Sequence, residues 1–225
     1  MSIIELSLYQ QAILLLAGLI ALTSFLMLGQ SRLVRLVKVF AAQGMLLAAT
    51  TALAATVLEY PHLYVSAALN LLLKGIVIPL LLQRLIHRLE LHRVMDTVDH
   101  PARVMMGGAA LVVFSYYVSL PVVENSHLVT LNAIAVSLAV VLLGMLLMIT
   151  RRQAVAHVVG FMSIENGLFF AAVVSTYGMP MVVELGVAFD VLVAAVVFGV
   201  FFFQIRASID SLNVDRLSKL SEVEP

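Results

Sequence analysis

The chain has 225 residues, of which 62% are hydrophobic and 12% are charged, and its formal net charge is zero. About a quarter of the residues in an ordinary soluble domain are charged, so this composition excludes that class and indicates a membrane protein. The chain contains no cysteine, which also excludes disulfides, thiolate iron–sulfur ligands and cysteine nucleophiles within it.

Seven apolar segments are long enough to cross a bilayer, which takes about 20 residues per helix. Backbone polar groups in lipid must be satisfied internally, so we predict an all-α polytopic fold with seven transmembrane helices. No basic leader and small-residue cleavage site accompany the first segment, and we therefore expect a retained helix there. In chain order, the predicted spans are residues 8–29, 37–58, 63–86, 102–120, 128–149, 154–176 and 181–203.

The basic residues predict the orientation of these spans. They gather in the connections between spans 1 and 2, 3 and 4, and 5 and 6, and after span 7. Seven spans place all these segments on one side, so we predict a cytoplasmic C-terminus and an N-terminus outside. The six tyrosines then all fall at the outer interface, as an aromatic belt would. The basic residues concerned are Arg32, Arg35, Lys38, Arg84, Arg88, Arg93, Arg103, Arg151, Arg152, Arg206, Arg216 and Lys219.

The longest cytoplasmic connection, residues 84–103, contains His92, Asp96 and His100 at a spacing of four. On a continuous helix this spacing would place three metal ligands on one face. Pro101 disfavours a regular helix at this point, and the neighbouring arginines oppose a bound cation. We therefore expect a solvated basic surface here.

Three ionisable side chains fall deep within the spans: Lys74, Glu165 and Asp190. A charge at the bilayer centre costs about 3 kcal/mol on insertion scales, so such residues are rare and usually functional. Counted from the outer ends of their spans, the three lie 11, 11 and 9 residues deep. At a rise of about 1.5 Å per residue, their depths differ by about 3 Å. We predict that they share one layer near the membrane midplane.

Such a layer suits proton or ion transfer. A carboxyl group in a low dielectric can bind and release a proton near neutral pH, and changing ion pairs of this kind operate in intramembrane relays. A buried lysine–acid pair can also serve only to fix helix register, and buried amides can serve only to join helices. Gln43, Asn70 and Asn132 are interpreted as such packing or hydrogen-bonding residues. The residues predicted for an ion path are Lys74, Glu165, Asp190, Glu184, His157 and Asn166.

Two local patterns bear on this layer. Gly160, Ser163 and Gly167 form one small-residue face of span 6, which favours close helix packing. Glu165 points elsewhere, with aromatic and aliphatic side chains one turn away on its own side. Pro79 follows the lysine of span 3 by five residues and is expected to loosen that helix.

The run RRQAVAHVVGFMSIEN at residues 151–166 contains a basic pair, an apolar stretch, a glycine, a carboxylate and an asparagine. This pattern resembles the second helix of subunit K of bacterial complex I. That family would place its glutamate at Met162, whereas this chain has Glu165, about one turn further on. The helix around Asp190 and the segment SLNVD at 211–215 are similar to that family's third helix and terminal motif. The C subunit of multi-subunit cation/proton antiporters shares this three-helix plan.

Three motifs extend a resemblance over nearly the whole chain: IENG at 164–167, VELGVAFD at 183–190, and Lys-x4-Pro at 74–79. Together they resemble component E of hydrogenase-4. The resemblance implies a membrane-arm subunit of a group 4 NiFe-hydrogenase, or of a related energy-converting oxidoreductase complex, in the bacterial cytoplasmic (inner) membrane. Antiporter-like and complex I-like membrane subunits and a peripheral hydrogenase arm would be its partners. No cofactor is expected in this chain, since the NiFe centre and the iron–sulfur clusters would belong to the partner subunits.

We therefore predict three parts: a four-helix membrane part at 1–126, a subunit K-like three-helix part at 127–203, and a cytoplasmic tail at 204–225. The predicted role is a non-catalytic subunit that contributes carboxylates to proton or sodium translocation. The alternative is a structural adaptor without its own ion path. A retinal photoreceptor with Lys74 as Schiff base is disfavoured, because the chain lacks tryptophan and the lysine lies in span 3. A secondary transporter is disfavoured because no matching pair of broken helices is found.

Overall fold

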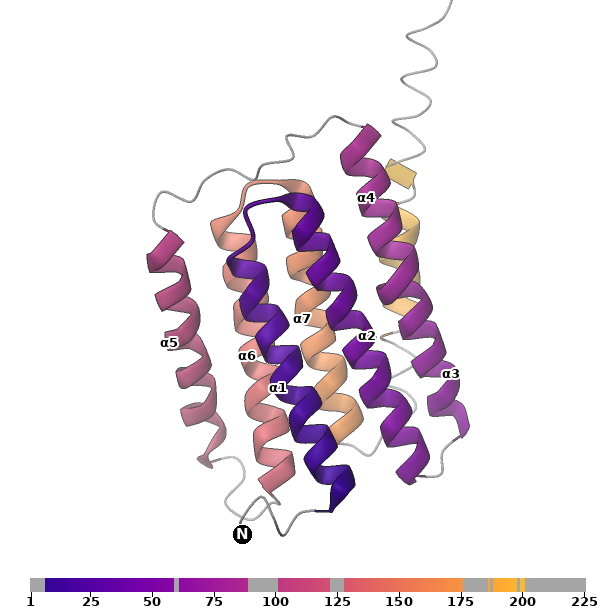
Figure 1. Cartoon of the computed structure of the whole chain (residues 1–225), viewed down its shortest axis with the longest axis vertical. Coiled ribbons are helices and arrows are strands. Elements are labelled where there is room, and N and C mark those ends of the chain that lie inside the picture. The colour runs from indigo at the N-terminus through magenta and orange to yellow at the C-terminus, as the bar shows by residue number, and fades with distance from the viewer. Residues whose placement is uncertain are drawn as a thin grey trace, which may run out of the picture.

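The computed structural model describes residues 7–58, 61–88, 101–121, 128–175, 186, 188–197 and 199–200. Nearly all of these residues are helical (Figure 1). In chain order the elements are α1 (Leu8–Leu28), α2 (Leu33–Leu58), α3 (Pro61–Asn70), the π-helical segment η2 (Leu71–Val77), α4 (Ile78–Arg88), α5 (Pro101–Ser119), α6 (Leu128–Thr150) and α7 (Ala154–Ser175). A further apolar helix spans Ala188–Val197.

Within the described residues, six helices are long and apolar enough to cross a membrane, and they correspond to the first six predicted spans. The main difference is at the second span, which was predicted from residue 37 and begins at Leu33. Arg35 and Lys38 lie in its first turns, where both residue types are good helix formers. The seventh span, 181–203, is described only in part and, like the orientation of the termini, stays a prediction. The six spans are Leu8–Leu28, Leu33–Thr56, Leu63–His87, Pro101–Ser119, Asn132–Thr150 and Ala154–Val174.

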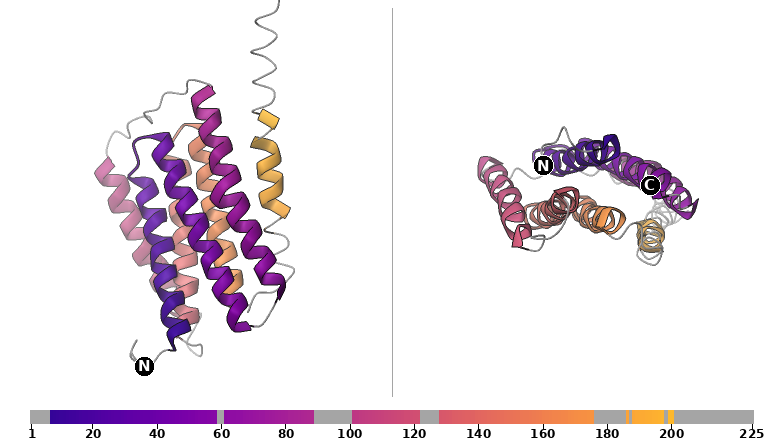
Figure 2. Two further views of the ribbon diagram at one scale, coloured as in Figure 1. Left: turned by 45° about the vertical axis from the view of Figure 1, so that its right-hand side comes forward. Right: turned by 90° about the horizontal axis from the view of Figure 1, so that it is seen from below.

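The described helices form two layers. One layer contains α1, α2 and the continuous rod α3–η2–α4, and the other contains α5, α6, α7 and the 188–197 helix (Figure 2). Across the layers, α1 packs against α6 and α2 against α7. The α1–α2 and α6–α7 connections lie at the same end of the molecule as the end of α4 and the start of α5 (Figure 1). The described ends of these three connections, which the sequence predicts to be cytoplasmic, therefore lie on one side, and the basic tail after span 7 is outside the described residues.

Glycines bring α6 and α7 into close contact. A Cβ atom at Gly144 would lie 2.8 Å from Cγ1 of Ile164 and 2.9 Å from the carbonyl oxygen of Gly160. A Cβ at Gly167 would lie 3.0 Å from the carbonyl oxygen of Ser137. The close packing predicted for the glycine face of α7 is thus confirmed. This packing positions the middle of α7, where Glu165 lies.

Replacing Gly144 by leucine is expected to destabilise the protein by about 1–3 kcal/mol, because the new side chain overpacks the α6–α7 contact. Thermal unfolding of the purified protein in detergent measures the effect. Gly107→Leu is the matched control, since a Cβ at Gly107 meets nothing within 4 Å. Equal unfolding temperatures for the two variants would contradict the close packing.

A buried arginine joins the α6–α7 connection to the end of α1. Nη2 of Arg151 donates hydrogen bonds to the carbonyl oxygens of Leu28, at 3.0 Å, and Gln30, at 2.9 Å. Carbonyl groups at a helix C-terminus lack intrahelical donors and favour a positive charge. Arg151, one of the basic residues used to predict the topology, therefore also caps α1.

Candidate functional site

Lys74 lies in the π-helical segment η2, where the helix is wider than an α-helix. The backbone N–H of Ile78 bonds to the carbonyl oxygen of Leu73, five residues back. Pro79 follows directly and has no N–H with which to complete an α-helical turn. The expected loosening of this helix is therefore observed as a π-helical turn, a feature frequent at functional sites.

Three ionisable side chains meet between η2, α7 and the 188–197 helix. Nζ of Lys74 donates a hydrogen bond to Oε2 of Glu165 and lies 3.4 Å from Oδ1 of Asp190. Lys74 and Asp190 are fully buried, and the Glu165 side chain is 13% exposed. We call these three residues the acid–base cluster. Their contact shows that the three side chains lie at one level, as predicted, whereas the position of this layer at the membrane midplane stays a prediction.

One lysine lies within ion-pairing distance of two carboxylates in the acid–base cluster. Within the described residues, neither carboxylate oxygen of Asp190 has a hydrogen-bond partner, so Lys74 is its ionic partner there. The Lys74 ammonium also lies 5.3 Å from the centroid of the Phe169 ring, close enough for a cation–π interaction. Removing an ion from water costs several kcal/mol unless the ion is paired. Two acids that face one ammonium group can therefore alternate as its ionic partner, provided that a proton moves from one carboxyl group to the other.

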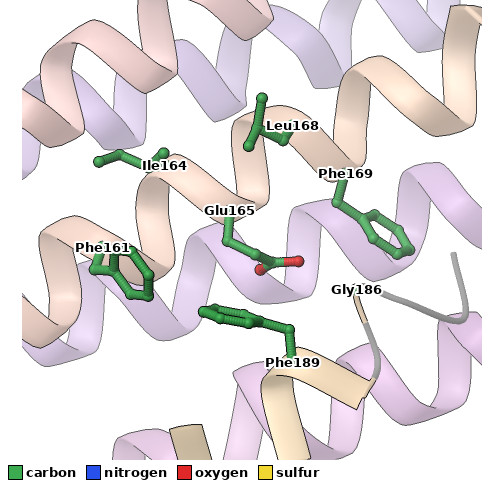
Figure 3. A pocket seen from close by; sticks show the side chains of 7 residues that line it. All are labelled: Phe161, Ile164, Glu165, Leu168, Phe169, Gly186 and Phe189. Atoms are coloured by element: carbon green, nitrogen blue, oxygen red, sulfur yellow. The ribbon is translucent and has the colours of Figure 1, made fainter. Parts of the chain in front are cut away.

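Glu165 also borders a cavity of about 440 Å³. Its second oxygen, Oε1, points toward Gly186, where an added Cβ would lie 3.3 Å away. The rings of Phe161 and Phe189 pack beside the carboxylate with their centroids 5.3 Å apart (Figure 3). Among the described residues that line this cavity, Glu165 alone is ionisable, so its carboxylate faces both a lysine and an apolar space. The lining residues are Phe161, Ile164, Glu165, Leu168, Phe169, Gly186 and Phe189.

The other residues predicted for the ion path do not join the cluster. Asn166 is fully buried but donates its amide hydrogen to Gln43 at 3.0 Å. His157 lies eight residues before Glu165 on α7, about 12 Å along the helix axis, and its Nδ1 lies 3.0 Å from the carbonyl oxygen of Gln153. Glu184 is outside the described residues. Of the six residues, the structure therefore brings three together.

Gln43 has a more specific place than the sequence suggested. It was interpreted as a packing or hydrogen-bonding residue, and its side chain in fact joins three helices. Nε2 donates to Oγ of Ser24 at 2.6 Å, while Oε1 accepts from Asn166. A glutamine in the middle of an apolar span was the available signal, but nothing in the sequence identified its partners.

Within the described part of the chain, no group of three or more histidine, cysteine, aspartate or glutamate residues could hold a metal ion. His92, Asp96 and His100 lie outside that part, as do the SLNVD segment and the tail at 204–225. The interpretations of these segments therefore stay predictions.

Comparison with known proteins gives full-length similarity. The chain is 31% identical to the uncharacterized protein Rv0085 of Mycobacterium tuberculosis over 207 residues, which cover 92% of this chain and 94% of that protein. It is 24% identical to hydrogenase-4 component E of Escherichia coli strain K12 over 205 residues, which cover 91% and 95% of the two chains. The Shigella flexneri component E gives the same values. No family model and no solved structure matches the chain. Because the alignments cover more than nine-tenths of each protein, the chain belongs to the same family as Rv0085 and is a full-length homologue of hydrogenase-4 component E.

Proposed function

We propose that this protein is a membrane-arm subunit of a NiFe-hydrogenase or a related energy-converting oxidoreductase complex in the bacterial cytoplasmic membrane. We further propose that its acid–base cluster takes part in proton or sodium translocation driven by electron transfer in partner subunits. The similarity to hydrogenase-4 component E supports the first part. The second part is carried by one observation, the buried Lys74 placed between carboxylates of two other helices.

The cluster can pass a proton without leaving an isolated charge in the membrane. With one proton shared by the two acids, one carboxylate is ionised and balances the ammonium group of Lys74. A proton that arrives at Glu165 neutralises it, and the ammonium then pairs with Asp190, which gives up its own proton. The Nζ–Oδ1 separation of 3.4 Å keeps this change of partner to a small movement. The states before and after the transfer each keep one ion pair, which avoids the large desolvation penalty of an unpaired buried ion.

The double substitution Glu165→Gln, Asp190→Asn tests this role. The amides keep the shapes of the acids but carry no exchangeable acid proton, so we expect electron transfer to continue while ion translocation per turnover falls strongly. The measurement is ion uptake per electron pair in proteoliposomes that contain the purified complex. Glu90→Gln, Asp96→Asn makes the same chemical changes in the predicted cytoplasmic connection and serves as the control. Unchanged translocation per turnover in the cluster variant would sink the proposal.

A structural adaptor is the second candidate, because the same ion pairs join η2, α7 and the 188–197 helix. An adaptor would need the cluster for assembly and not for transport. In that case the Glu165→Gln, Asp190→Asn variant would lose partner subunits on purification, and any complex that still assembled would translocate ions normally.

A further inference from the structure

Two adjacent residues of α2 contact both helices that carry the Lys74–Glu165 ion pair. Gln43 accepts a hydrogen bond from Asn166, the residue after Glu165 on α7. Gly44 packs against Lys74 itself, since a Cβ at Gly44 would lie 2.9 Å from both the carbonyl carbon and Cβ of Lys74. A single turn of α2 therefore touches Lys74 and the residue next to Glu165.

The orientation of the Gln43 amide is fixed from both ends. Its side chain is fully buried, its nitrogen donates to Ser24 at 2.6 Å, and its oxygen accepts from Asn166 at 3.0 Å. Ser24 in turn donates to the carbonyl oxygen of Ile20 at 3.1 Å. A buried amide without partners is costly where no water can replace them. Gln43 thereby holds α7 at a defined height and rotation against α1 and α2.

Gly44 determines how closely η2 approaches α2. Its missing side chain lets the backbone of η2 approach α2, and the carbonyl oxygen of Lys74 would lie only 3.0 Å from an added Cβ. The atoms that a side chain would meet belong mainly to the backbone, so they cannot rotate away. Small residues at helix contacts in membranes allow this kind of approach.

We propose that Gln43 and Gly44 are positioning residues for the acid–base cluster. Gln43 positions Glu165 through Asn166, and Gly44 positions Lys74 through the backbone of η2, so that ammonium and carboxylate meet. A lysine has a long flexible stem and η2 is a widened helix, so the ion pair needs such external positioning. The consequence for ion translocation rests on the proposed function, whereas the contact itself does not.

The test measures the contact directly in the full-length protein in lipid bilayers. Lysine labelled with ¹⁵N at Nζ and glutamate labelled with ¹³C at Cδ give a solid-state NMR cross-peak only where the two atoms are close. We expect one Lys74–Glu165 cross-peak, identified by its loss in Glu165→Gln. Gln43→Asn shortens the amide by one methylene and should remove most of the signal, because dipolar coupling falls steeply with distance. Adding Asn166→Gln restores the combined side-chain length and should restore the cross-peak.

Gly44→Ala should also weaken the cross-peak, and Gln30→Asn, which shortens a glutamine at the α1–α2 connection, should leave it unchanged. A full-strength signal in Gln43→Asn, or no recovery in Gln43→Asn, Asn166→Gln, would overturn the positioning role. If Gln43→Asn loses the cross-peak while the complex translocates ions normally, positioning holds and the proposed function fails.

Discussion

Replacing Lys74 by methionine is expected to destabilise the protein by about 3–5 kcal/mol, because it removes one partner from a buried ion cluster. Methionine has a similar length and no charge, so the change acts mainly on electrostatics. Both carboxylates lose the ammonium group that binds them, and Asp190 has no hydrogen-bond partner within the described residues to replace it. The expected loss is a large share of the stability of an ordinary domain.

The unfolding temperature in detergent measures this loss, and the triple variant Lys74→Met, Glu165→Gln, Asp190→Asn identifies its cause. The triple variant has no buried charge in the cluster and should recover much of the stability, as neutral replacements of buried ion groups often do. Lys38→Met is the control, since Lys38 is exposed in the first turns of α2. If Lys74→Met unfolds at the same temperature as Lys38→Met, the two acids do not depend on the lysine.

The sequence predicted the depth of the cluster but not its lateral contacts. Depth follows from the fixed rise per residue of a helix, so counting from the span ends placed Lys74, Glu165 and Asp190 in one layer. Lateral order depends on which faces pack together. These spans are apolar on all sides, and no polar stripe marks the neighbour of each helix. The pairing of η2 with α7 therefore required the three-dimensional structure.

Periodic features of the sequence were predictable, whereas single contacts between distant segments were not. Close packing of α6 on α7 could be predicted because Gly160 and Gly167 recur on one helix face. Pro79 indicated an irregular helix, but it did not indicate that the irregularity would be a π-helical turn. The role of Gln43 could not be predicted, because a single amide in an apolar span is compatible with any neighbouring polar partner. Specific hydrogen bonds between distant segments leave no periodic signal.

The carboxylate of α7 lies about one turn away from the position that the subunit K pattern predicts. The resemblance to subunit K would place it at Met162, three residues before Glu165, which is about 4.5 Å along the axis and about 60° around the helix. Met162 is fully buried in an apolar cluster with Leu143 and Leu147 of α6. Glu165 instead faces Lys74 and the cavity. The side chains at positions 162 and 165 therefore face different environments.

Exchanging the two residues, as Met162→Glu, Glu165→Met, is expected to abolish ion translocation and to lower the yield of folded protein. The composition is unchanged, but the carboxylate moves into the apolar α6–α7 core, where an unpaired charge costs several kcal/mol. Ion uptake per electron pair and the monodisperse fraction in size-exclusion chromatography measure the two effects. Met162→Leu, a volume-conserving change of about 1.5 kcal/mol or less, controls for packing. Normal translocation by the exchanged variant would show that a carboxylate at 162 reaches Lys74, and that the cluster tolerates its acid on either turn of α7. Loss of translocation in a variant that still folds would instead place the requirement on the turn that faces η2, where the ion pair with Lys74 forms.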